Sequence, residues 1–568
     1  MKILKSVGCS IIFFLLLSTY AKAEVFYVTT QQEFDNAQSN AKANDSIVWR
    51  NGTYTDIFME IEKDNLTIMA EELGKTIFTG ESYVDIKSDN INFIGFQFLD
   101  GNIGQEHVIN VRGSHVLITQ INIRAYTSYK YLRVREESQY TTITYCNFEN
   151  RLNLDDQNIL SLLVDDTNPG YHKVQYCSFK NFDGTGNDLG IEPIRVGVST
   201  QADFNSRCVV EYCYFTQCNG DGELISSKAS QNVYRFNTFE DNPRAELVLR
   251  HGSESIVYGN FFLNGKGGVR VREGQDHYIY NNYFYEIDDR AIYIQNEDSD
   301  PLDNINIAFN TIVDCSEIRL GGTGNDKPTN VTFTNNIFSD PDDDLFEDAT
   351  GTETWIGNIA FGDLGISVPS SGVSRQDPLL VKNSQGFFGL DANSPAIDAA
   401  QPGFASLPEF MGVENIDTDL LFDMMKQERP SSIAERDLGS NEYPHNVPIQ
   451  PFATEENTGP DYNTSTTTSV QKIAQNVSDF LKVYPNPVYD TLTIETNNKS
   501  KARLKIDIFN TEGKMVYSIP TQTIIADKLT LSYNIGFFPA GIYTMRATIE
   551  DIPSGPKKMQ SINFSKVE

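Results

Sequence analysis

Short strand-like apolar runs recur at a nearly constant spacing along residues 26–338, and each ends in a similar four-residue motif. The motif reads Tyr212-Cys-Tyr-Phe215 in one run and Phe236-Asn-Thr-Phe239 in the next. Its second position holds Cys213, Asn237, Asn260, Asn282, Asn310 and Asn336, in steps of 24, 23, 22, 28 and 26 residues. Such a period is typical of one coil of a parallel β-helix, with short insertions at the turns.

The period has a simple physical reading. One coil buries an apolar side but cannot close a core alone, so coils must stack. Stacking places equivalent residues ~4.8 Å apart, where an Asn amide can bond the next Asn and the Phe two residues later can stack inside. We therefore expect an all-β chain built as a right-handed parallel β-helix. The competing interpretation, a β-sandwich with coincidental Asn-x-Phe motifs, does not need such a period.

Composition shifts divide the chain further. A β-helix unit is expected over residues 24–445, with a loop-rich closing region from Asp377 to Glu442. Residues 446–478 are rich in Thr, Asn, Ser, Glu and Pro and are interpreted as a linker. Alternating runs in residues 479–568 predict a small C-terminal β-sandwich.

The first 23 residues have the pattern of a secretory signal. Lys2 and Lys5 precede the apolar run Ile11–Leu17, and Ala21-Lys-Ala23 is a cleavage pattern. That run is too short to cross a bilayer, and no later segment is expected to do so. Export would permit disulfides, but Cys146, Cys177 and Cys213 sit in Tyr-Cys-x-Phe within strand-like runs, which favours buried free thiols over disulfides.

The formal net charge of −32 argues against a nucleic-acid partner, since phosphates need a basic surface. The same negative charge would not attract an anionic polymer either. If the ligand is anionic, a local basic cluster must overcome the overall field.

Such a cluster follows from the coil period. Lys228, Arg250 and Arg272 are 22 residues apart, one coil each, and Arg195 and Arg270 fall on the same predicted sheet. Cations on successive coils repel one another, so without an anionic ligand this arrangement is unfavourable; a basic ladder beside carboxylates is a candidate site. The alternative is a set of surface ion pairs.

Carboxylates accompany these cations. Asp221 and Glu223 lie on one face of a strand, and Glu192 holds the position of Glu223 on an earlier coil. Three such oxygens could hold a hard cation such as Ca²⁺, or they could neutralise Lys and Arg.

These groups suit β-elimination in a uronic acid polymer. The C5 proton is weakly acidic until a cation or Arg neutralises the neighbouring carboxylate. A base then removes that proton while an acid assists departure of O4. Lys can be the base where neighbouring cations lower its pKa. Hydrolysis would need two carboxyl groups flanking the bond, whereas basic residues occupy the centre here.

At these residues the sequence resembles polysaccharide lyase family 6, the alginate lyases and chondroitinase B, over roughly residues 25–445. The most specific stretch is Asp221-Gly-Glu-Leu-Ile-Ser-Ser-Lys228, and the other segments are Asn51-Gly-Thr-Tyr, Asn237-Thr-Phe239, Leu249-Arg-His-Gly252, Asn260-Phe-Phe262, Gly268-Val-Arg-Val271 and Ser394-Pro-Ala-Ile-Asp398.

The resemblance implies roles for individual residues. Lys228 matches the Brønsted base and Arg250 the Brønsted acid, and His251 and Arg270 match substrate-contacting positions. Glu223 matches a calcium ligand, Asp221 stands where the family usually has Glu, and the third ligand is Asn187 or Glu192. Arg195 and Arg272 are expected to contact substrate from the same ladder. Because some members work without calcium, the metal requirement stays open.

The C-terminal unit resembles the sorting domain of type IX secretion, through Tyr484-Pro-Asn-Pro487 and Gly541-Ile-Tyr-Thr; a carbohydrate-binding β-sandwich is the alternative. The sequence thus predicts a secreted or surface-attached monomer that acts on alginate. Two other hypotheses stay open, a lyase for dermatan sulfate and a non-catalytic glycan-binding protein or adhesin.

Overall fold

The structure is a computed structural model that describes most of the chain. The described residues are 23–152, 157–183, 190–295, 302–321, 327–367, 369, 371–463, 481–484, 491–497, 502–510, 515–524, 528–535, 538, 541–551 and 557–566. The expected signal segment, apart from Ala23, lies outside them. Two compact units divide between Ser465 and Thr466.

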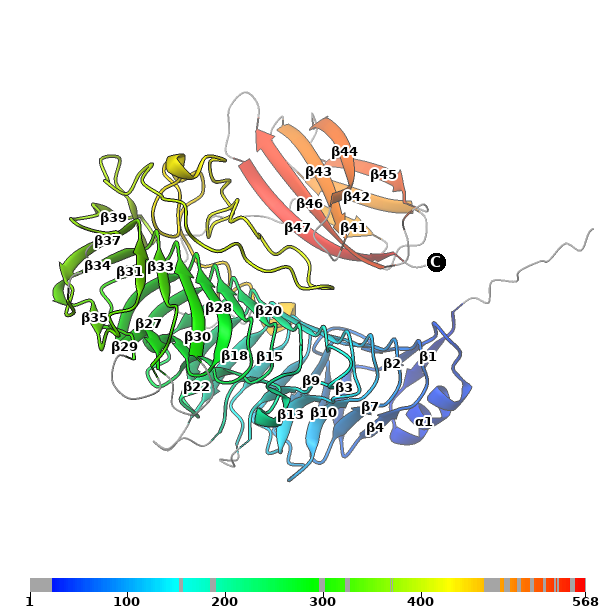
Figure 1. Ribbon diagram of the computed structural model, residues 1–568. Coiled ribbons are helices and arrows are strands. Elements are labelled where there is room, and N and C mark those ends of the chain that lie inside the picture. The colour runs from blue at the N-terminus through cyan, green and yellow to red at the C-terminus, as the bar shows by residue number, and fades with distance from the viewer. Residues whose placement is uncertain are drawn as a thin grey trace, which may run out of the picture. The chain divides into compact units, whose positions relative to one another are not determined.

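The first unit is a parallel β-helix with three faces, as the repeats predict (Figure 1). Face A consists of β1 (Val25–Val28), β2 (Ser46–Trp49), β5 (Thr67–Ala70), β8 (Asn92–Ile94), β11 (Leu117–Thr119), β14 (Thr142–Thr144), β17 (Lys173–Gln175), β20 (Val209–Glu211), β23 (Val233–Arg235), β26 (Ile256–Tyr258), β28 (Gly274–Tyr280), β30 (Leu302–Ala308), β33 (Thr332–Thr334) and β36 (Thr354–Ile356).

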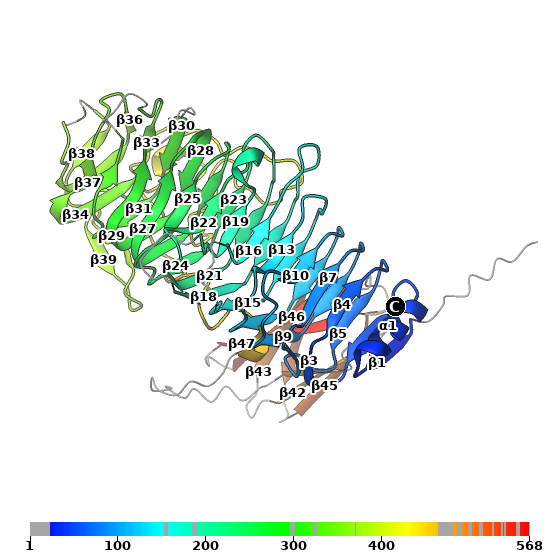
Figure 2. The same cartoon turned by 90° about the horizontal axis from the view of Figure 1, so that it is seen from below.

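Faces B and C are two parallel ladders joined through the long strands β27 (Phe261–Val271) and β29 (Tyr283–Ile294). Face B, which Figure 2 displays, also contains β4 (Phe58–Ile61), β7 (Tyr83–Ile86), β10 (His107–Val111), β13 (Lys130–Val134), β16 (Leu160–Leu162), β19 (Ile194–Val196), β22 (Glu223–Ser227), β25 (Glu246–Leu249), β32 (Ile318–Arg319) and β35 (Phe346–Glu347). Face C also contains β3 (Gly52–Thr55), β6 (Thr76–Thr79), β9 (Phe96–Leu99), β12 (Asn122–Arg124), β15 (Asn147–Glu149), β18 (Ser178–Phe182), β21 (Tyr214–Cys218), β24 (Thr238–Glu240), β31 (Thr311–Val313), β34 (Ile337–Asp344), β37 (Asn358–Asp363) and β38 (Val373–Arg375).

The repeated Asn residues form the amide ladder that the sequence predicts. Asn237 donates to Asn260 at 3.0 Å, and Asn260 donates in turn to Asn282 at 3.0 Å. Each side chain also serves the backbone: Asn260 Oδ1 accepts from Asn237 N, and its Nδ2 donates to Tyr234 O. These buried polar groups are therefore satisfied by the next coil, which fixes the stacking register.

The predicted aromatic stack lies inside the coils. Phe179, Phe215, Phe239, Phe262 and Phe284 follow one another at centroid distances of 4.7–4.9 Å. All six cysteines after the signal segment are free and buried, which confirms the thiol interpretation. Helix α1 (Gln31–Asn40) covers the first coil, where Phe34 stacks on Trp49. No helix in the described ranges is long and apolar enough to span a membrane.

A long strap returns from the last coil along the β-helix. It contains the hairpin β39 (Leu380–Lys382) and β40 (Phe388–Leu390) and continues to Asn463. Residues 446–463 were expected to be linker, but Ile449 is buried and the hydroxyl of Tyr462 donates to Phe96 O and Gln120 O. Apolar and hydrogen-bonded contacts thus extend the packed unit beyond the expected boundary at 445.

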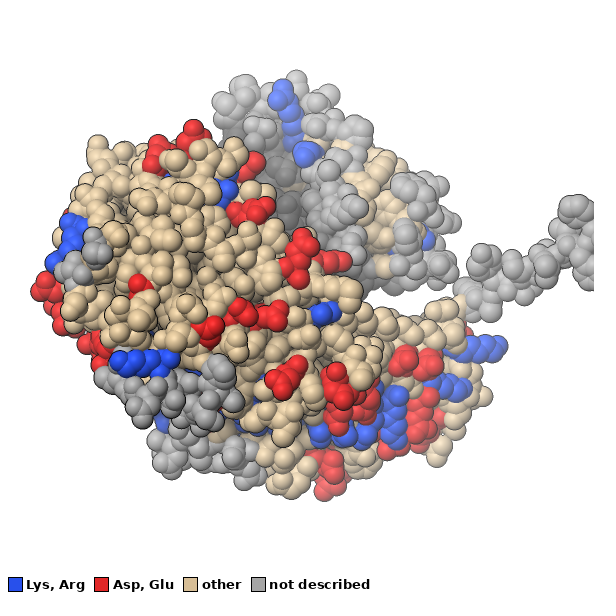
Figure 3. Space-filling view, viewed as in Figure 1, with Lys and Arg blue, Asp and Glu red and all other residues tan. Residues whose placement is uncertain are grey.

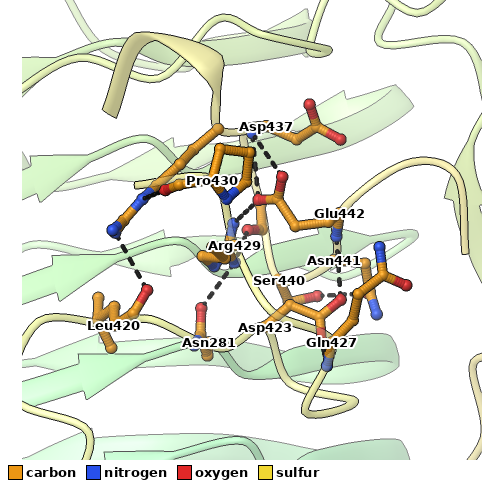
Figure 4. A network of polar contacts seen from close by, with 12 residues as sticks. Asn281, Leu420, Asp423, Gln427, Arg429, Pro430, Asp437, Ser440, Asn441 and Glu442 are labelled. Carbon is orange, nitrogen blue, oxygen red and sulfur yellow. Dashed lines mark hydrogen bonds and ion pairs between the residues drawn. The ribbon is translucent and has the colours of Figure 1, made fainter. Parts of the chain in front are cut away.

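A buried ion pair fastens this strap (Figure 4). Arg429 is fully buried; it pairs with Glu442 and donates to Asn281 Oδ1 and Gly439 O at 3.0 Å each. Burial raises the pKa of Glu442 to about 7, although Arg429 opposes that shift. The pair needs both members, because either charge alone would be stranded in the interior.

The second unit consists of two antiparallel sheets, one of β41 (Leu481–Tyr484), β42 (Thr491–Asn497) and β45 (Lys528–Asn534), the other of β43 (Ala502–Asn510), β44 (Met515–Ile524), β46 (Gly541–Asp551) and β47 (Lys557–Lys566). Side chains from both sheets, including Leu492, Ile506 and Met545, share one core. The expected small β-sandwich is therefore present.

Replacing Arg429 by Ala should destabilise the first unit by roughly 3–5 kcal/mol, because the Glu442 carboxylate would stay buried without its partner. The measurement is the shift in denaturant unfolding midpoint. Arg375→Ala is the matched control: its pair with Asp363 is exposed, so its loss should cost at most about 1 kcal/mol. Equal shifts for the two variants would contradict the assigned role of the strap.

Candidate functional site

Parallel register aligns outward-facing side chains of face B in one column along the helix axis. We call this the outer column; it runs through Glu60, Asp85, Asn110, Arg133, Ser161, Arg195, Ser226, Val248, Arg270, Tyr293, Arg319 and Glu347. Arg195 and Arg270 are thus on one face, as the sequence predicts, with the strands of Ser226 and Val248 between them.

The three cations spaced by the coil period lie side by side at the ends of consecutive strands. The backbone N–H groups of Lys228, Arg250 and Arg272 donate to Val196 O, Ser227 O and Leu249 O at 2.8, 2.8 and 3.0 Å. Neighbours in this row are therefore one strand spacing apart, ~4.8 Å.

Lys228 is a half-buried lysine with a cationic environment. Burial lowers the pKa of its ammonium, and Arg195 and Arg250 lower it further. Its ammonium has no hydrogen-bond partner among the side chains that the structure describes. Such a lysine releases its proton more readily than an exposed one, which is what a general base requires.

Arg250 is held by Glu223. Its Nη1 donates to Glu223 Oε1, and this carboxylate helps to raise the pKa of the guanidinium above its usual value, against the effect of burial. Arg250 Nε and Glu223 Oε2 are both buried without a hydrogen-bond partner within the described part of the chain. Arg250 is therefore a fixed, permanently charged group that still has an unused donor.

Arg195 pairs with Glu192 in a similar way. Arg195 Nη2 donates to Glu192 Oε2 at 2.6 Å, and its Nε donates to Oε1 at 3.1 Å. Burial raises the pKa of Glu192 to about 7, with contributions from Glu223 and Asp221. The carboxylates expected to bind a metal are thus close enough to influence one another, and two of them are paired with arginines.

Asp221 accepts backbone hydrogen bonds, from Gly190 N at 2.6 Å and from Glu223 N at 3.2 Å. Asn187 lies outside the described residues. Over the described ranges, no group of three His, Cys, Asp or Glu side chains has the arrangement of a metal site.

His251 and Arg270 flank the row of cations. His251 contacts Glu273 Oε2 through Nδ1 at 2.6 Å and Ser199 Oγ through Nε2 at 3.1 Å. Both ring nitrogens therefore have protein partners, and the expected contact with substrate stays a prediction. Arg270 lies 3.6 Å from Glu246 and its guanidinium stacks 4.8 Å from the Tyr293 ring.

The sequence reasoning missed Tyr293 and the upstream cations. The guanidinium carbons of Arg270, Arg290 and Arg319 lie 4.8, 4.7 and 5.5 Å from the centroid of the Tyr293 ring. Arg133 belongs to the outer column. The coil period was the available signal: the segment Lys130-Tyr-Leu-Arg-Val resembles the later strands in its alternation. Basic and acidic side chains alternate where Figure 1 places β4 to β13 (Figure 3).

Comparisons with known proteins agree with this fold. The family model described as Chondroitinase B matches residues 28–341, more than half of the chain, and the Secretion system C-terminal sorting domain matches residues 482–559. No curated protein matches the sequence significantly.

Solved structures share the fold at low sequence identity. The polysaccharide lyase family 6 alginate lyase AlyGC is 24% identical over 65% of this chain and 55% of its own, so the match spans about half of that protein, with a TM-score of 0.60. A family 6 alginate lyase solved with a trisaccharide is 20% identical over 67% of this chain and 93% of its own, with a TM-score of 0.56. A mannuronic acid specific family 6 lyase from human gut microbiota is 22% identical over 60% and 86%, with a TM-score of 0.54.

Arg195→Gln should raise the pKa of Lys228, because it removes the neighbouring positive charge that lowers this pKa most after burial. The pKa is measured by NMR of ¹³C-methylated lysines, with Lys228→Ala to assign the signal. Arg124→Ala removes an exposed cation on face C and should leave the Lys228 signal unchanged. An unaltered Lys228 titration in Arg195→Gln would contradict the electrostatic account.

Proposed function

Because the chain belongs to the chondroitinase B family, we propose that it is a polysaccharide lyase that cleaves alginate by β-elimination. One observation carries the proposal: Lys228, with its lowered pKa, lies beside the anchored Arg250 at the ends of neighbouring strands. A base and a charged donor one strand spacing apart can act on C5 and O4 of the same glycosidic linkage.

Lys228 is proposed to remove the C5 proton. In its neutral form the amine has a free lone pair, and no hydrogen bond to a described side chain would have to break first. Loss of that proton places negative charge on the uronate carboxylate, so nearby guanidinium groups stabilise the transition state more than the ground state. Arg195 and Arg272 are the candidates for this electrostatic role.

Arg250 is proposed to assist the departing O4. Because its pKa is raised, Arg250 acts chiefly as a charged hydrogen-bond donor that stabilises the negative charge developing on O4, and it passes on a proton only as the C4–O4 bond breaks. The Glu223 pair fixes the orientation of the guanidinium, and its unused Nε donor provides one hydrogen bond toward the leaving oxygen. Lys228 takes the C5 proton, the C4–O4 bond breaks as a C4=C5 double bond forms, and O4 receives a proton from Arg250. The products are an unsaturated sugar at one new chain end and a hydroxyl group at the other.

Calcium is proposed as an additional source of positive charge. The residue types suit a hard cation, since Glu192, Asp221 and Glu223 carry carboxylate oxygens and Glu223 Oε2 has no hydrogen-bond partner among the described residues. These three side chains would have to move to coordinate one ion, because over the described ranges they do not have the arrangement of a metal site. When bound, calcium would neutralise the substrate carboxylate. Arg195 and Arg250 already pair with Glu192 and Glu223, so these arginines offer the same chemistry without a metal.

The family model also supports a second substrate, a glycosaminoglycan such as dermatan sulfate, whose iduronate presents an equivalent C5 proton. A non-catalytic glycan-binding protein would not require a lysine with a lowered pKa next to an anchored arginine. The sorting domain supports secretion or attachment at the cell surface.

Lys228→Ala should lower the rate of unsaturated product formation by at least ~100-fold, the usual contribution of a general base, while the unfolding midpoint stays close to that of the parent protein. The assay is ultraviolet absorbance with poly-mannuronate, poly-guluronate and dermatan sulfate supplied separately. Lys173→Ala, on face A, is the control and should keep full activity. The substrate that gives the highest rate decides between alginate and dermatan sulfate, and an active Lys228→Ala variant would exclude the assigned base.

Thorough chelation should slow turnover if the three carboxylates hold calcium, and added Ca²⁺ should restore it. Glu223→Gln should reduce calcium binding, measured directly by calorimetry on the substrate-free protein. Unchanged rates after chelation, together with no measurable calcium binding, would assign these carboxylates to Arg195 and Arg250 alone.

A further inference from the structure

A second group of cations lies on face B, on strands before the candidate active site. It consists of Lys130 and Arg133 on β13 and of Arg135 directly after β13, which is paired with Glu136 and Glu137. The neutral imidazole of His107, on β10, lies beside Arg133. The outer column links Arg133 through Ser161 to Arg195, and the next strand, β22, leads to Lys228. Arg133 is therefore three strand spacings from the strand of Lys228, ~14 Å along the axis.

Arg133 is only weakly compensated by carboxylates. Its Nη2 is 4.0 Å from Glu136 Oε2, beyond hydrogen-bond distance, and its Nη1 lies 3.4 Å from His107 Nε2. The pKa of His107 is lowered to about 3, by burial and then by Arg133, so this imidazole is neutral. Arg133 Nε is buried without a partner within the described part of the chain, while 24% of the side chain is exposed.

Lys130 adds a buried positive charge behind Arg133. Its ammonium donates to Asn158 Oδ1 at 2.5 Å and to Gln157 Oε1 at 2.8 Å, and both are neutral amides. Burial lowers the pKa of Lys130 to about 7, and Arg195 and Arg133 contribute. Lys130, Arg133 and Arg195 thus lie close enough together to influence one another, in a chain whose formal net charge is −32.

The basic region does not extend along the whole of face B. Beyond β10, a hollow of about 390 Å³ is lined by Phe58 and Tyr83 together with Glu81 and Glu106. Those carboxylates do not suit a polyanion, so the positive strip on this side stops at β10 and β13. Arg133 is its last weakly paired, partly exposed cation before the acidic hollow.

We propose that Arg133, supported by Lys130, binds a carboxylate of a uronate chain several sugar units away from the bond that Lys228 attacks. This inference rests on the proposed function and extends it to the substrate length that the protein recognises. An extended polyanion that follows the outer column would contact Arg195 near the dyad and Arg133 at a distance, so long chains would gain a contact that short oligomers lack.

The test compares Arg133→Ala with the parent protein on uronate oligomers of increasing length and on the polymer. The loss in kcat/KM should grow with length and reach roughly 3–10-fold on the polymer, mainly through KM, as expected for one charge-assisted contact. It should shrink at high salt, where partly exposed charges are screened. Arg133→Lys should retain part of the effect, and Arg124→Ala, an exposed cation on face C, is the matched control.

Direct binding separates this inference from the proposed reaction. Calorimetry with poly-uronate on the Lys228→Ala protein, with and without Arg133→Ala, should show the same 3–10-fold weakening without any turnover. If the parent protein cleaves no uronate polymer, the proposed function is wrong, and the binding comparison still decides the role of Arg133. Equal losses on short and long substrates, or unaltered polymer binding, would overturn the inference.

Discussion

Parallel, in-register stacking of the coils is the constraint on which the rest of the molecule depends. Backbone hydrogen bonds and the Asn ladder, such as Asn260 to Asn282 at 3.0 Å, prevent one coil from slipping relative to the next. A side chain that faces outward on one strand then has its neighbour ~4.8 Å away on the next. Functional residues that are a whole coil apart in the sequence therefore lie next to one another in a single row.

The same constraint makes the row electrostatically costly. Like charges one strand spacing apart repel, and a separate carboxylate pairs with Arg250 in the row and with Arg195 beside it: Glu223 for Arg250 and Glu192 for Arg195. Lys228 receives no such partner among the described side chains, and burial together with the neighbouring arginines disfavours its charge. Carboxylates thus neutralise the arginines but not the lysine. This difference gives different acid–base properties to side chains that occupy equivalent backbone positions.

The coil period was enough to predict the β-helix, the buried thiols and the adjacency of Lys228, Arg250 and Arg272, because each depends only on chain spacing. It could not assign partners within the site. His251 lies between Ser199 and Glu273, whose positions in sequence are 52 and 22 residues away, and such contacts depend on side-chain rotamers. The last part of the strap shows the other limit. Its polar composition from residue 446 onward predicts a linker, yet Ile449 and Tyr462 are packed by contacts that the repeat pattern does not predict.

The negative charge of the whole chain does not prevent the row from attracting an anion, because the two sets of charges act over different distances. At physiological ionic strength the Debye length is ≈ 8 Å, so a polyanion at the row is screened from most of the distributed negative charge. Within that distance it meets guanidinium groups fixed on strands, held by Glu192 and Glu223 and partly desolvated. Fixed and desolvated charges interact more strongly than mobile surface charges. The proposed recognition of an anionic polymer is therefore assigned to a local property of face B, and it depends on the same stacking that brings the cations together.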